Sequence, residues 1–301
     1  MHVVVVTVSA RTSPSGVCRH AANLALGMLA QPSVERVTLL AGSWQMQYLR
    51  EAFGVVGERL ELVPIDITNS AVGRNFWYLR GLPAMVKALG ADVVHLAFPM
   101  PVLRSMFAMP LVVSLHDFYA FDMPENFGRR AWLNRVALRL CLRSVDAIAC
   151  VSAATQERLR ERFALAAERS VVVPNAVGLR PGAVRAPLPE ALCGGPYVLC
   201  VAQHRANKNL ALLMESFDLA RREGLIEPGM KLAIAGHFGP ETDRLQRMVE
   251  EHGLEERVVF LRDLSDAMLY SLYAGCAIVV APSVMEGFGL PVAEALSIGC
   301  R

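Results

Sequence analysis

The sequence predicts an α/β protein of two Rossmann-like domains, each built on a doubly wound parallel sheet, and three observations predict it. Short runs rich in Val, Ile and Leu alternate with helical patterns along all 301 residues, as in layered α/β folds. Few polar residues interrupt these runs, which is typical of parallel strands covered by helices on both faces. A stretch with four prolines and four glycines, residues 178–196, separates two series of such runs and indicates a linker.

Ten apolar runs are expected to form strands. The six before the linker are Val3–Val8, Val37–Leu40, Val93–Leu96, Leu111–Leu115, Ala147–Val151 and Val171–Val173. The four after it are Tyr197–Val201, Lys231–Ala235, Val258–Leu261 and Ala277–Ala281. The N-terminal run has no cationic start and no long apolar block, so we interpret it as a first strand and not as a signal peptide.

Domain boundaries follow from the linker. We place an N-terminal domain at residues 1–182 and a C-terminal domain at residues 190–301, with a ligand at the carboxyl ends of their strands, in the cleft between them. The second domain offers four strands and stops within L-S-I-G-C-R, where another strand is due. We therefore expect it to be truncated, a naturally short domain being the alternative.

The composition argues against several classes of protein. With 53% hydrophobic residues the chain can build sizeable cores, and a net charge of +2 gives no reason to expect nucleic-acid binding. Its seven cysteines include no C-x-x-C pair, so we expect buried thiols in a reducing compartment, the cytoplasm. The uncharged run 267–285 has the length of a membrane span, but Gly275 and Pro282 divide it, and we expect a helix, a turn and a buried strand.

The segment P-S-V-M-E-G-F-G-L-P-V-A-E-A near the C-terminus carries the strongest functional signal. It follows a predicted strand and opens a helix with Pro291 at its first position, so it presents free N–H groups suited to phosphate. Gly287 and Gly289 permit positive φ and close backbone approach. Glu286, and Glu294 in the first turn of the helix, are acceptors suited to sugar or ribose hydroxyls. The spacing of the two glutamates alone would indicate no more than surface residues.

A second signal is A-Q-H-R-A-N-K-N-L, which directly follows the strand Tyr197–Val201. Arg205 and Lys208 lie in this loop, before a helix that is expected to begin near Asn209. Two cations beside a helix N-terminus suit a diphosphate and would neutralise a leaving group. The alternative is a solvated basic loop.

The first domain offers weaker signals. Gly16 lies between the first strand and an apolar-periodic helix, where it lets the backbone approach a ligand. His116 ends the strand Leu111–Leu115, a position that favours a ligand contact, although a lone histidine is usually structural. Asn175 is equally consistent with an Asx turn.

Several motifs are missing from the sequence. It contains no D-x-D, no H-E-x-x-H and no paired Cys and His at ligand spacing, so neither a metal nor a cofactor is expected. It lacks G-x-G-x-x-G, which disfavours a nicotinamide-linked oxidoreductase, and it lacks G-x-S-x-G and a Walker loop.

At these residues the chain resembles glycosyltransferase family 4, retaining enzymes of the GT-B fold, in which two Rossmann-like domains face each other across a cleft. The resemblance covers essentially the whole chain. Its strongest parts are the E-x7-E pattern of Glu286 and Glu294 with G-F-G-L between them, and the loop of Arg205 and Lys208. It implies a hexosyltransferase that uses a nucleotide-diphospho-sugar as substrate without a metal.

Two further segments carry the resemblance. V-V-V-P-N-A-V at 171–177 is similar to the family's P-N-G segment, with Ala176 in place of glycine, and L-H-D at 115–117 looks like that of members acting on mannose-type donors. Family members usually continue beyond G-C-x with another strand and helices. A truncated, inactive fragment, or a nucleotide-sugar binder without turnover, is therefore the alternative function.

The resemblance also implies roles for the residues of the second domain. Glu286 would bind hydroxyls of the donor sugar and Glu294 the ribose, while Arg205 and Lys208 would stabilise the departing diphosphate. Backbone N–H groups would hold the sugar and the diphosphate. These groups lie around Phe288, Gly289 and Leu290.

In the first domain, the resemblance implies that His116 lies beside the reacting end of the donor sugar and that Gly16 approaches the phosphate. It further implies a front-face retaining route, in which the leaving phosphate accepts the proton of the acceptor hydroxyl. The acceptor would be a glycan or a lipid-linked sugar, as in polysaccharide biosynthesis.

A basic amphipathic pattern at residues 129–143 bears on the membrane. Its two stripes are Arg135, Arg139 and Arg143 on one side and Trp132, Val136 and Leu140 on the other. Such a helix can lie on anionic lipid, which would make the protein peripheral at the inner face of a membrane. We favour the alternative, a surface helix whose apolar stripe packs on the sheet.

Overall fold

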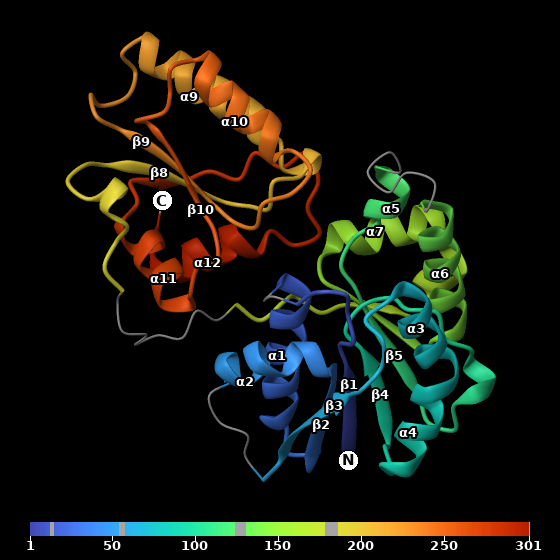
Figure 1. Cartoon of the computed structure of the whole chain (residues 1–301). Coiled ribbons are helices and arrows are strands. Elements are labelled where there is room, and N and C mark those ends of the chain that lie inside the picture. Colours follow the sequence, from blue (N-terminus) through green and yellow to red (C-terminus); the bar gives the residue numbers. More distant parts are fainter. Residues whose placement is uncertain (13–14, 54–57, 124–130, 178–185, 301) are drawn as a thin grey trace. The chain divides into compact units, whose positions relative to one another are not determined.

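The computed structural model describes residues 1–12, 15–53, 58–123, 131–177 and 186–300. The chain divides into two compact units, Met1–Ala176 and Val177–Arg301 (Figure 1). The predicted linker begins at residue 178, and its first part, 178–185, lies outside the described residues.

A parallel sheet of seven strands forms the centre of the first unit, as far as its residues are described. The strand order is β3-β2-β1-β4-β5-β6-β7. The strands are β1 (His2–Val6), β2 (Arg36–Gly42), β3 (Leu60–Ile65), β4 (Val93–Leu96), β5 (Leu111–Leu115), β6 (Ala147–Cys150) and β7 (Ser170–Val172). Every pairing is parallel. The six strands predicted for this half of the chain are confirmed, with ends that differ by at most two residues.

The seventh strand, β3, is not among the predicted ones. Its sequence L-E-L-V-P-I is interrupted by Glu61 and Pro64, so no apolar run marks it. In the described sheet it pairs with β2 alone and lies at an edge. An edge strand tolerates proline because one side of its backbone needs no ladder hydrogen bond.

Helices cover both faces of this sheet (Figure 1). They are α1 (Gly16–Leu29), α2 (Met46–Phe53), α3 (Ala71–Phe76), α4 (Leu82–Ala88), α5 (Tyr119–Asp122), α6 (Ala131–Ser144), α7 (Ala153–Arg162) and α8 (Ala164–Ala167). A π-helical turn, Trp77–Gly81, joins α3 to α4. Strand β1 shows the two faces directly, because Val3 and Val5 pack in one core and Val4 and Val6 in the other.

The second unit repeats this design on a smaller sheet. In its described residues four parallel strands follow the order β10-β9-β8-β11. The strands are β8 (Tyr197–Val201), β9 (Lys231–Ala235), β10 (Val258–Leu261) and β11 (Ile278–Val279), and the helices are α9 (Leu210–Arg222), α10 (Thr242–Glu251), α11 (Asp266–Gly275) and α12 (Leu290–Ile298). Helices α9 and α10 pack on one face, and α11 and α12 on the other.

The uncharged run 267–285 is a helix followed by a short strand, as predicted, because it comprises most of α11 and then β11. The prediction that this strand is buried is wrong, because Ile278 is exposed and Val279 only half-buried at the edge of the described sheet. Among the described residues, no helix has the length and apolar character needed to cross a membrane.

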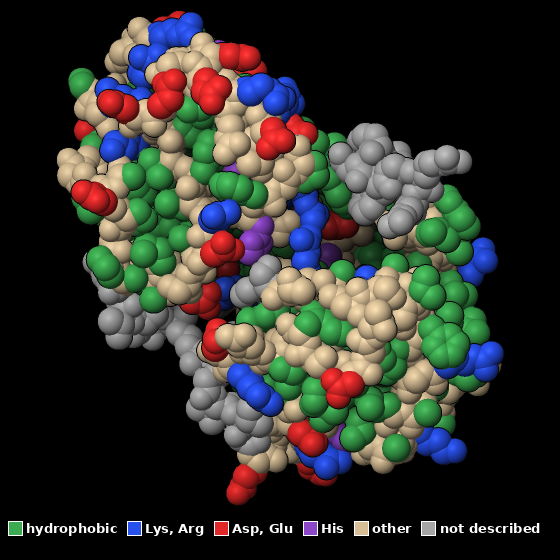
Figure 2. All heavy atoms as spheres, viewed as in Figure 1, with side chains coloured by type: hydrophobic (Ala, Val, Ile, Leu, Met, Phe, Trp, Pro, Cys, Tyr) green, Lys and Arg blue, Asp and Glu red, His purple; other side chains and the backbone are tan. Residues whose placement is uncertain are grey.

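Helix α6 differs from the expectation. The side chains of Trp132 and Val136 are 60% and 48% exposed, so the prediction that this stripe packs on the sheet is wrong. The helix is buried through Leu138, Cys141 and Leu142. These residues form a second apolar stripe at i, i+3 and i+4, and this stripe packs against the core in place of the predicted one. Figure 2 shows hydrophobic side chains on the side of the first unit where Figure 1 places α6.

The strand orders indicate where a ligand site belongs. In each sheet the chain reverses its direction of winding at one point, between β1 and β4 in the first unit and between β8 and β11 in the second. Open α/β sheets bind ligands at the carboxyl ends of the strands at such a switch point.

Candidate functional site

The switch point of the second unit brings two predicted site residues together. The loops that follow β8 and β11 meet there, since the backbone N–H of Val284 donates to the carbonyl of Asn207 at 3.0 Å. Lys208 from the first loop forms an ion pair with Glu286 from the second. The hydroxyl of Ser283 donates to the same carboxylate at 2.8 Å. The side chains of the ion pair are 19% and 32% exposed, so both charges remain accessible to a ligand.

The loop after β8 owes its shape to one residue. Ala206–Lys208 is a single 3-10 turn, and Asn209 adopts a left-handed conformation, with φ of 52°, before α9 begins at Leu210. Asparagine tolerates this region better than most side chains. Arg205 directly precedes the turn and is half-buried.

Two glycines brace this loop, and neither was predicted. A Cβ on Gly236 would lie 2.0 Å from the carbonyl oxygen of Ala202, and one on Gly239 would lie 2.5 Å from that of His204. The segment after β9 therefore packs directly on the backbone that leads to Arg205. The sequence signal was A-G-H-F-G at the end of an apolar run, a glycine pair where two backbones come close.

The glycine loop leads into α12 as expected, with small differences. Gly289 has φ of 79° and precedes the helix, so its freedom is used, whereas Gly287 does not have positive φ. Leu290 is the first helical residue, so Pro291 is the second and not the first. Gly287 and Phe288 are half-buried in the loop. The N-terminus of this nine-residue helix presents backbone donors to the same switch point.

Glu294 differs from Glu286 in its surroundings. Because α12 begins at Leu290, Glu294 is the fifth helical residue and lies beyond the first turn, contrary to the prediction. Glu294 is only 5% exposed, and its carboxylate accepts a hydrogen bond of 3.1 Å from the hydroxyl of Tyr273 on α11. The structure thus gives Glu294 a buried partner and leaves Glu286 at the surface.

His116 lies at the carboxyl end of β5 in the first unit. Its Nε2 is 2.8 Å from the carbonyl oxygen of Ala97 at the end of β4. A carbonyl only accepts, so Nε2 carries the proton and Nδ1 has a free lone pair. Burial lowers the pKa of His116, against smaller opposing effects of the Ala97 bond and Asp117. The ring is therefore a neutral acceptor at pH 7.

Two more histidines lie beside this position, and no sequence motif predicted them. The ring of His20 on α1 meets the ring of His116 edge-on, with centroids 4.6 Å apart. The hydroxyl of Ser114 lies 2.7 Å from Nε2 of His20 and 2.8 Å from Nε2 of His95. Burial lowers the pKa of His20 to about 3 and that of His95 to about 4, and the neighbouring His116 adds to both shifts.

Gly16 is the first residue of α1 and is exposed. Ser15 caps this helix by accepting a hydrogen bond of 3.4 Å from the backbone N–H of Cys18. His20 lies one turn further along α1, so the helix links the position of Gly16 to that of His116. Both lie at the carboxyl edge of the first sheet.

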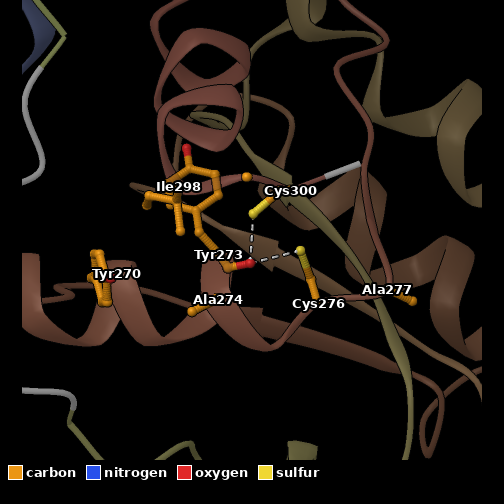
Figure 3. A pocket seen from close by; sticks show the side chains of 8 residues that line it. Tyr270, Tyr273, Ala274, Cys276, Ala277, Ile298 and Cys300 are labelled. Carbon is orange, nitrogen blue, oxygen red and sulfur yellow. Dashed lines mark hydrogen bonds between the residues drawn. The ribbon is translucent and has the colours of Figure 1, made fainter.

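The cavity shown in Figure 3 lies elsewhere. It has a volume of about 360 Å³ and lies where α11 and α12 end, at the amino end of β11. Both Cys276 and Cys300 donate their thiol hydrogens to the carbonyl of Tyr273 beside it. The predicted site residues lie at the opposite, carboxyl end of β11, so this cavity takes no part in their arrangement. Within the described ranges, no three His, Cys, Asp or Glu side chains are grouped to hold a metal ion.

Known families match both units. The model of Glycosyltransferase Family 4 matches residues 14–180, more than half of the chain. The model of Glycosyl transferases group 1 matches residues 192–301.

Curated relatives are similar at a distance. Over 195 residues the chain is 29% identical to O-antigen chain mannosyltransferase B of Escherichia coli, covering 62% of this chain and 51% of the relative. It is 27% identical over 188 residues to serotype-specific mannosyltransferase WbdA of Escherichia coli, covering 58% and 22%. The chain thus spans from about a fifth to a half of the length of these relatives.

Solved structures share the fold. Sucrose-phosphate synthase from Thermosynechococcus elongatus matches with a TM-score of 0.70 at 16% identity, over all of this chain and 80% of that one. Alr3699/HepE of Anabaena, in complex with UDP and glucose, matches with 0.67 at 22% identity, over all of this chain and 79% of that one. These likenesses confirm the predicted α/β architecture of the GT-B type.

Proposed function

We propose that this chain, which belongs to glycosyltransferase family 4, transfers a sugar from a nucleotide-diphospho-sugar to an acceptor hydroxyl. The observation that carries the proposal is the ion pair of Lys208 and Glu286 at the switch point of the second sheet, beside the N-terminus of α12. A cation, a carboxylate and free backbone donors in one place match a donor that carries both phosphates and hydroxyls.

The charged groups would act on the leaving group. As the glycosidic bond to phosphate breaks, negative charge collects on the diphosphate, and preorganised donors stabilise that charge most in the transition state. Arg205 and Lys208 supply positive charge, and the amides around Phe288, Gly289 and Leu290 supply donors at the start of α12. We propose that this set suffices without a metal.

The hydroxyl-binding roles fall to the remaining residues. We propose that Glu286 accepts hydrogen bonds from the donor sugar and that Glu294, steadied by Tyr273, accepts from the ribose. His116 presents the lone pair of Nδ1, supported by its bond to Ala97, and would accept from a hydroxyl at the reacting end of the sugar. Gly16 would approach the phosphate.

The stereochemical course that we propose is retention by a front-face route. In this route the bond from the anomeric carbon to the leaving phosphate breaks, and the acceptor oxygen attacks from the same side. Its proton passes to the leaving phosphate, so no protein base is required. Burial lowers the pKa of His116, and its neutral ring is consistent with a site that binds hydroxyls and takes up no proton.

The donor that we propose carries mannose. Two relatives of 27% and 29% identity are named mannosyltransferases, and the segment L-H-D resembles that of family members acting on such donors. A structural neighbour holds UDP and glucose, so a panel of bases must accompany the test.

The acceptor that we propose is a glycan or a lipid-linked sugar, met at the cytoplasmic face of a membrane. The exposed side chains of Trp132 and Val136 on α6 support a peripheral contact, and the seven free thiols suit a reducing compartment. Flotation with vesicles of phosphatidylcholine and phosphatidylglycerol tests this contact, and a chain that stays at the bottom of the gradient would exclude it.

The decisive experiment measures transfer from GDP-mannose, UDP-glucose and other nucleotide sugars by the wild type and by Glu286→Gln. We expect the variant to lose at least tenfold in kcat/KM, because a charged hydrogen-bond acceptor contributes about 1.5–3 kcal/mol. Glu256→Gln is the matched control, since Glu256 is exposed at the amino end of β10. Equal turnover by Glu286→Gln and the wild type would remove the proposed role.

A further inference from the structure

Three arginines surround one aromatic ring in the first unit, outside the groups already assigned. The guanidinium carbons of Arg135 and Arg139, both on α6, lie 5.5 and 5.1 Å from the ring centre of Phe121 on α5. That of Arg162 on α7 lies 5.9 Å from the same centre. Figure 1 shows α5, α6 and α7 together at the upper edge of this unit. The face of the ring thus holds cations from two helices at contact distance.

The next residue, Asp122, adds a fourth arginine to this group. Arg158 on α7 donates to one carboxylate oxygen of Asp122 at 2.7 Å, and Arg162 pairs with the other. The Asp122 side chain is only 7% exposed, whereas those of Arg158 and Arg162 are 41% and 38% exposed. The carboxylate is therefore enclosed and the guanidinium groups still face solvent. We call Arg135, Arg139, Arg158 and Arg162 the arginine cluster.

Among the described residues, the arginine cluster carries more positive charge than the carboxylate that pairs with it balances. Asp122 is the single carboxylate that pairs with it in the part of the chain that the structure describes. Arg135 donates from Nε to the carbonyl of Ala120 at 3.0 Å, and Arg139 rests on Phe121. Neither forms an ion pair with a described residue. Four like charges held around Phe121 and Asp122 repel one another unless a further anion joins them.

The position of the cluster relates it to His116. The hydroxyl of Thr155, in the first turn of α7, donates to the backbone carbonyl of His116 at 3.3 Å. Arg158 and Arg162 follow Thr155 by three and seven residues on this helix, which places them roughly 5 and 10 Å along its axis. The cluster thus begins one to two helical turns from the proposed reacting position.

We propose that the arginine cluster binds the phosphate or diphosphate group of an anionic acceptor. This inference rests on the proposed function, because the distance from His116 leaves room for a short glycan between the reacting hydroxyl and the phosphate. Guanidinium forks bind phosphate oxygens in pairs, and the excess of positive charge favours a dianion. The anion has two sources, the headgroup of a membrane lipid or the phosphate of an acceptor free in solution.

The first experiment is calorimetric titration with inorganic diphosphate. We expect two classes of site in the wild type, one at the arginine cluster and one at Arg205 and Lys208. The double variant R135Q/R139Q loses the first, with affinity falling at least tenfold because two charge-assisted contacts are removed. K208Q loses the second. The matched control R143Q/R160Q removes the same charge from α6 and α7 outside the cluster and keeps both.

These outcomes separate the two proposals. If R135Q/R139Q keeps both sites at wild-type affinity, the acceptor site is excluded and the donor site is untouched. If K208Q leaves both classes of diphosphate site at wild-type affinity, the proposed role of Lys208 in binding the donor diphosphate is excluded. Melting temperatures establish that the variants fold, and R139Q serves alone if the double variant does not, since Arg139 lies on the exposed side of α6.

The second experiment distinguishes the sources of the anion. Cosedimentation compares vesicles of phosphatidylcholine with and without phosphatidylglycerol. A lipid headgroup as source predicts that R135Q/R139Q binds phosphatidylglycerol vesicles at least tenfold more weakly than R143Q/R160Q does. Equal vesicle binding by the two variants, with diphosphate binding lost in R135Q/R139Q alone, assigns the anion to an acceptor in solution. No difference between them in either experiment overturns the proposal.

Discussion

The carboxyl edges of the two sheets carry different chemistry. In the first unit this edge holds His20, His95 and His116, and burial lowers the pKa of each ring, so all three are neutral at pH 7. In the second unit the corresponding edge holds Lys208 and Glu286, which are charged and partly exposed. One edge offers neutral hydrogen-bonding groups, and the other offers fixed charge.

This difference corresponds to the two kinds of group in a sugar-nucleotide reaction. A diphosphate is charged throughout and gains charge as it leaves, so it requires cations that need no rearrangement. Sugar hydroxyls are neutral and are best bound by groups that neither repel nor neutralise them. The comparison therefore supports the proposal that the charged leaving group is stabilised in the second unit and that neutral hydroxyls are also bound in the first.

The largest expected effect tests the charged edge. We expect Lys208→Gln to lower kcat/KM by about 10²–10³-fold, the usual result of removing one preorganised electrostatic group, with KM for the acceptor unchanged. Steady-state kinetics with saturating acceptor measure it. Lys231→Gln is the control, because Lys231 donates to the carbonyl of Ala191 at the amino end of β9. If Lys208→Gln is as active as this control, the charge at the carboxyl edge of the second sheet is not needed for transfer.

The next effect tests how the charged edge is held. Gly236→Ala would bring a Cβ to 2.0 Å from the carbonyl of Ala202, and we expect a loss of about 1–3 kcal/mol in unfolding free energy. Far-UV circular dichroism in urea measures it. Gly195→Ala should cost much less, since its Cβ would lie 3.7 Å from the nearest atom, the carbonyl oxygen of Gly229. Similar midpoints for the two variants would show that the loop before Arg205 is not braced in this way.

A smaller effect tests the neutral edge. Glutamine at position 116 can still donate to the carbonyl of Ala97 but lacks an acceptor at the place of Nδ1, whereas asparagine keeps an acceptor there. We expect both variants to lose about tenfold or more in kcat, with His116→Gln the less active and His116→Asn the less stable. The reverse order of activities would mean that the Ala97 bond, and not Nδ1, is the important feature.

The smallest expected effect is the change of unfolding free energy with pH. The pKa of four histidines is lowered in the first unit, namely His2, His20, His95 and His116, and of one in the second, His204. Below pH 6.5 these histidines bind protons in the unfolded chain but remain largely neutral in the folded chain. The free energy of unfolding therefore falls as pH falls. Each buried ring contributes a slope of at most about 1.4 kcal/mol per pH unit.

The loss for His20 extends down to about pH 3 and that for His95 to about pH 4. All three tryptophans, Trp44, Trp77 and Trp132, belong to the first unit, so tryptophan fluorescence follows its unfolding. We expect His95→Gln, which can still bond Ser114, to reduce the slope between pH 6.5 and 5. An unchanged slope would mean that His95 is already protonated in the fold.

Sequence patterns predicted the strands well because each buried parallel strand is an apolar run with clear ends. They failed for β3, where Glu61 and Pro64 interrupt the run, since a strand at the edge of a sheet needs neither continuous burial nor every backbone donor. They also misplaced the start of α12, and with it the helical position of Glu294, by one residue, because that start depends on the left-handed φ of Gly289.

The candidate site could be predicted where it depends on short segments. The loops of Lys208 and Glu286 each show their glycines and charges locally, although their pairing depends on the order of β8 and β11. The cluster of His20, His95 and Ser114 could not be predicted, because α1, β4 and β5 contribute one residue each. Neither periodicity nor spacing reports which residues face one another across strands.

The hydrogen bond from Val284 to Asn207 joins the loop that carries Glu286 to the loop that carries Lys208. Two segments fastened in this way cannot be altered independently, and substitutions in them should show a coupling energy of about 0.5–3 kcal/mol in a double-mutant cycle. If the two loops hold the donor as proposed, we expect a change of sugar preference to depend on paired substitutions, one in each loop. Under that proposal, evolution of a new donor preference would proceed more readily through combinations of changes in the two loops than through single ones.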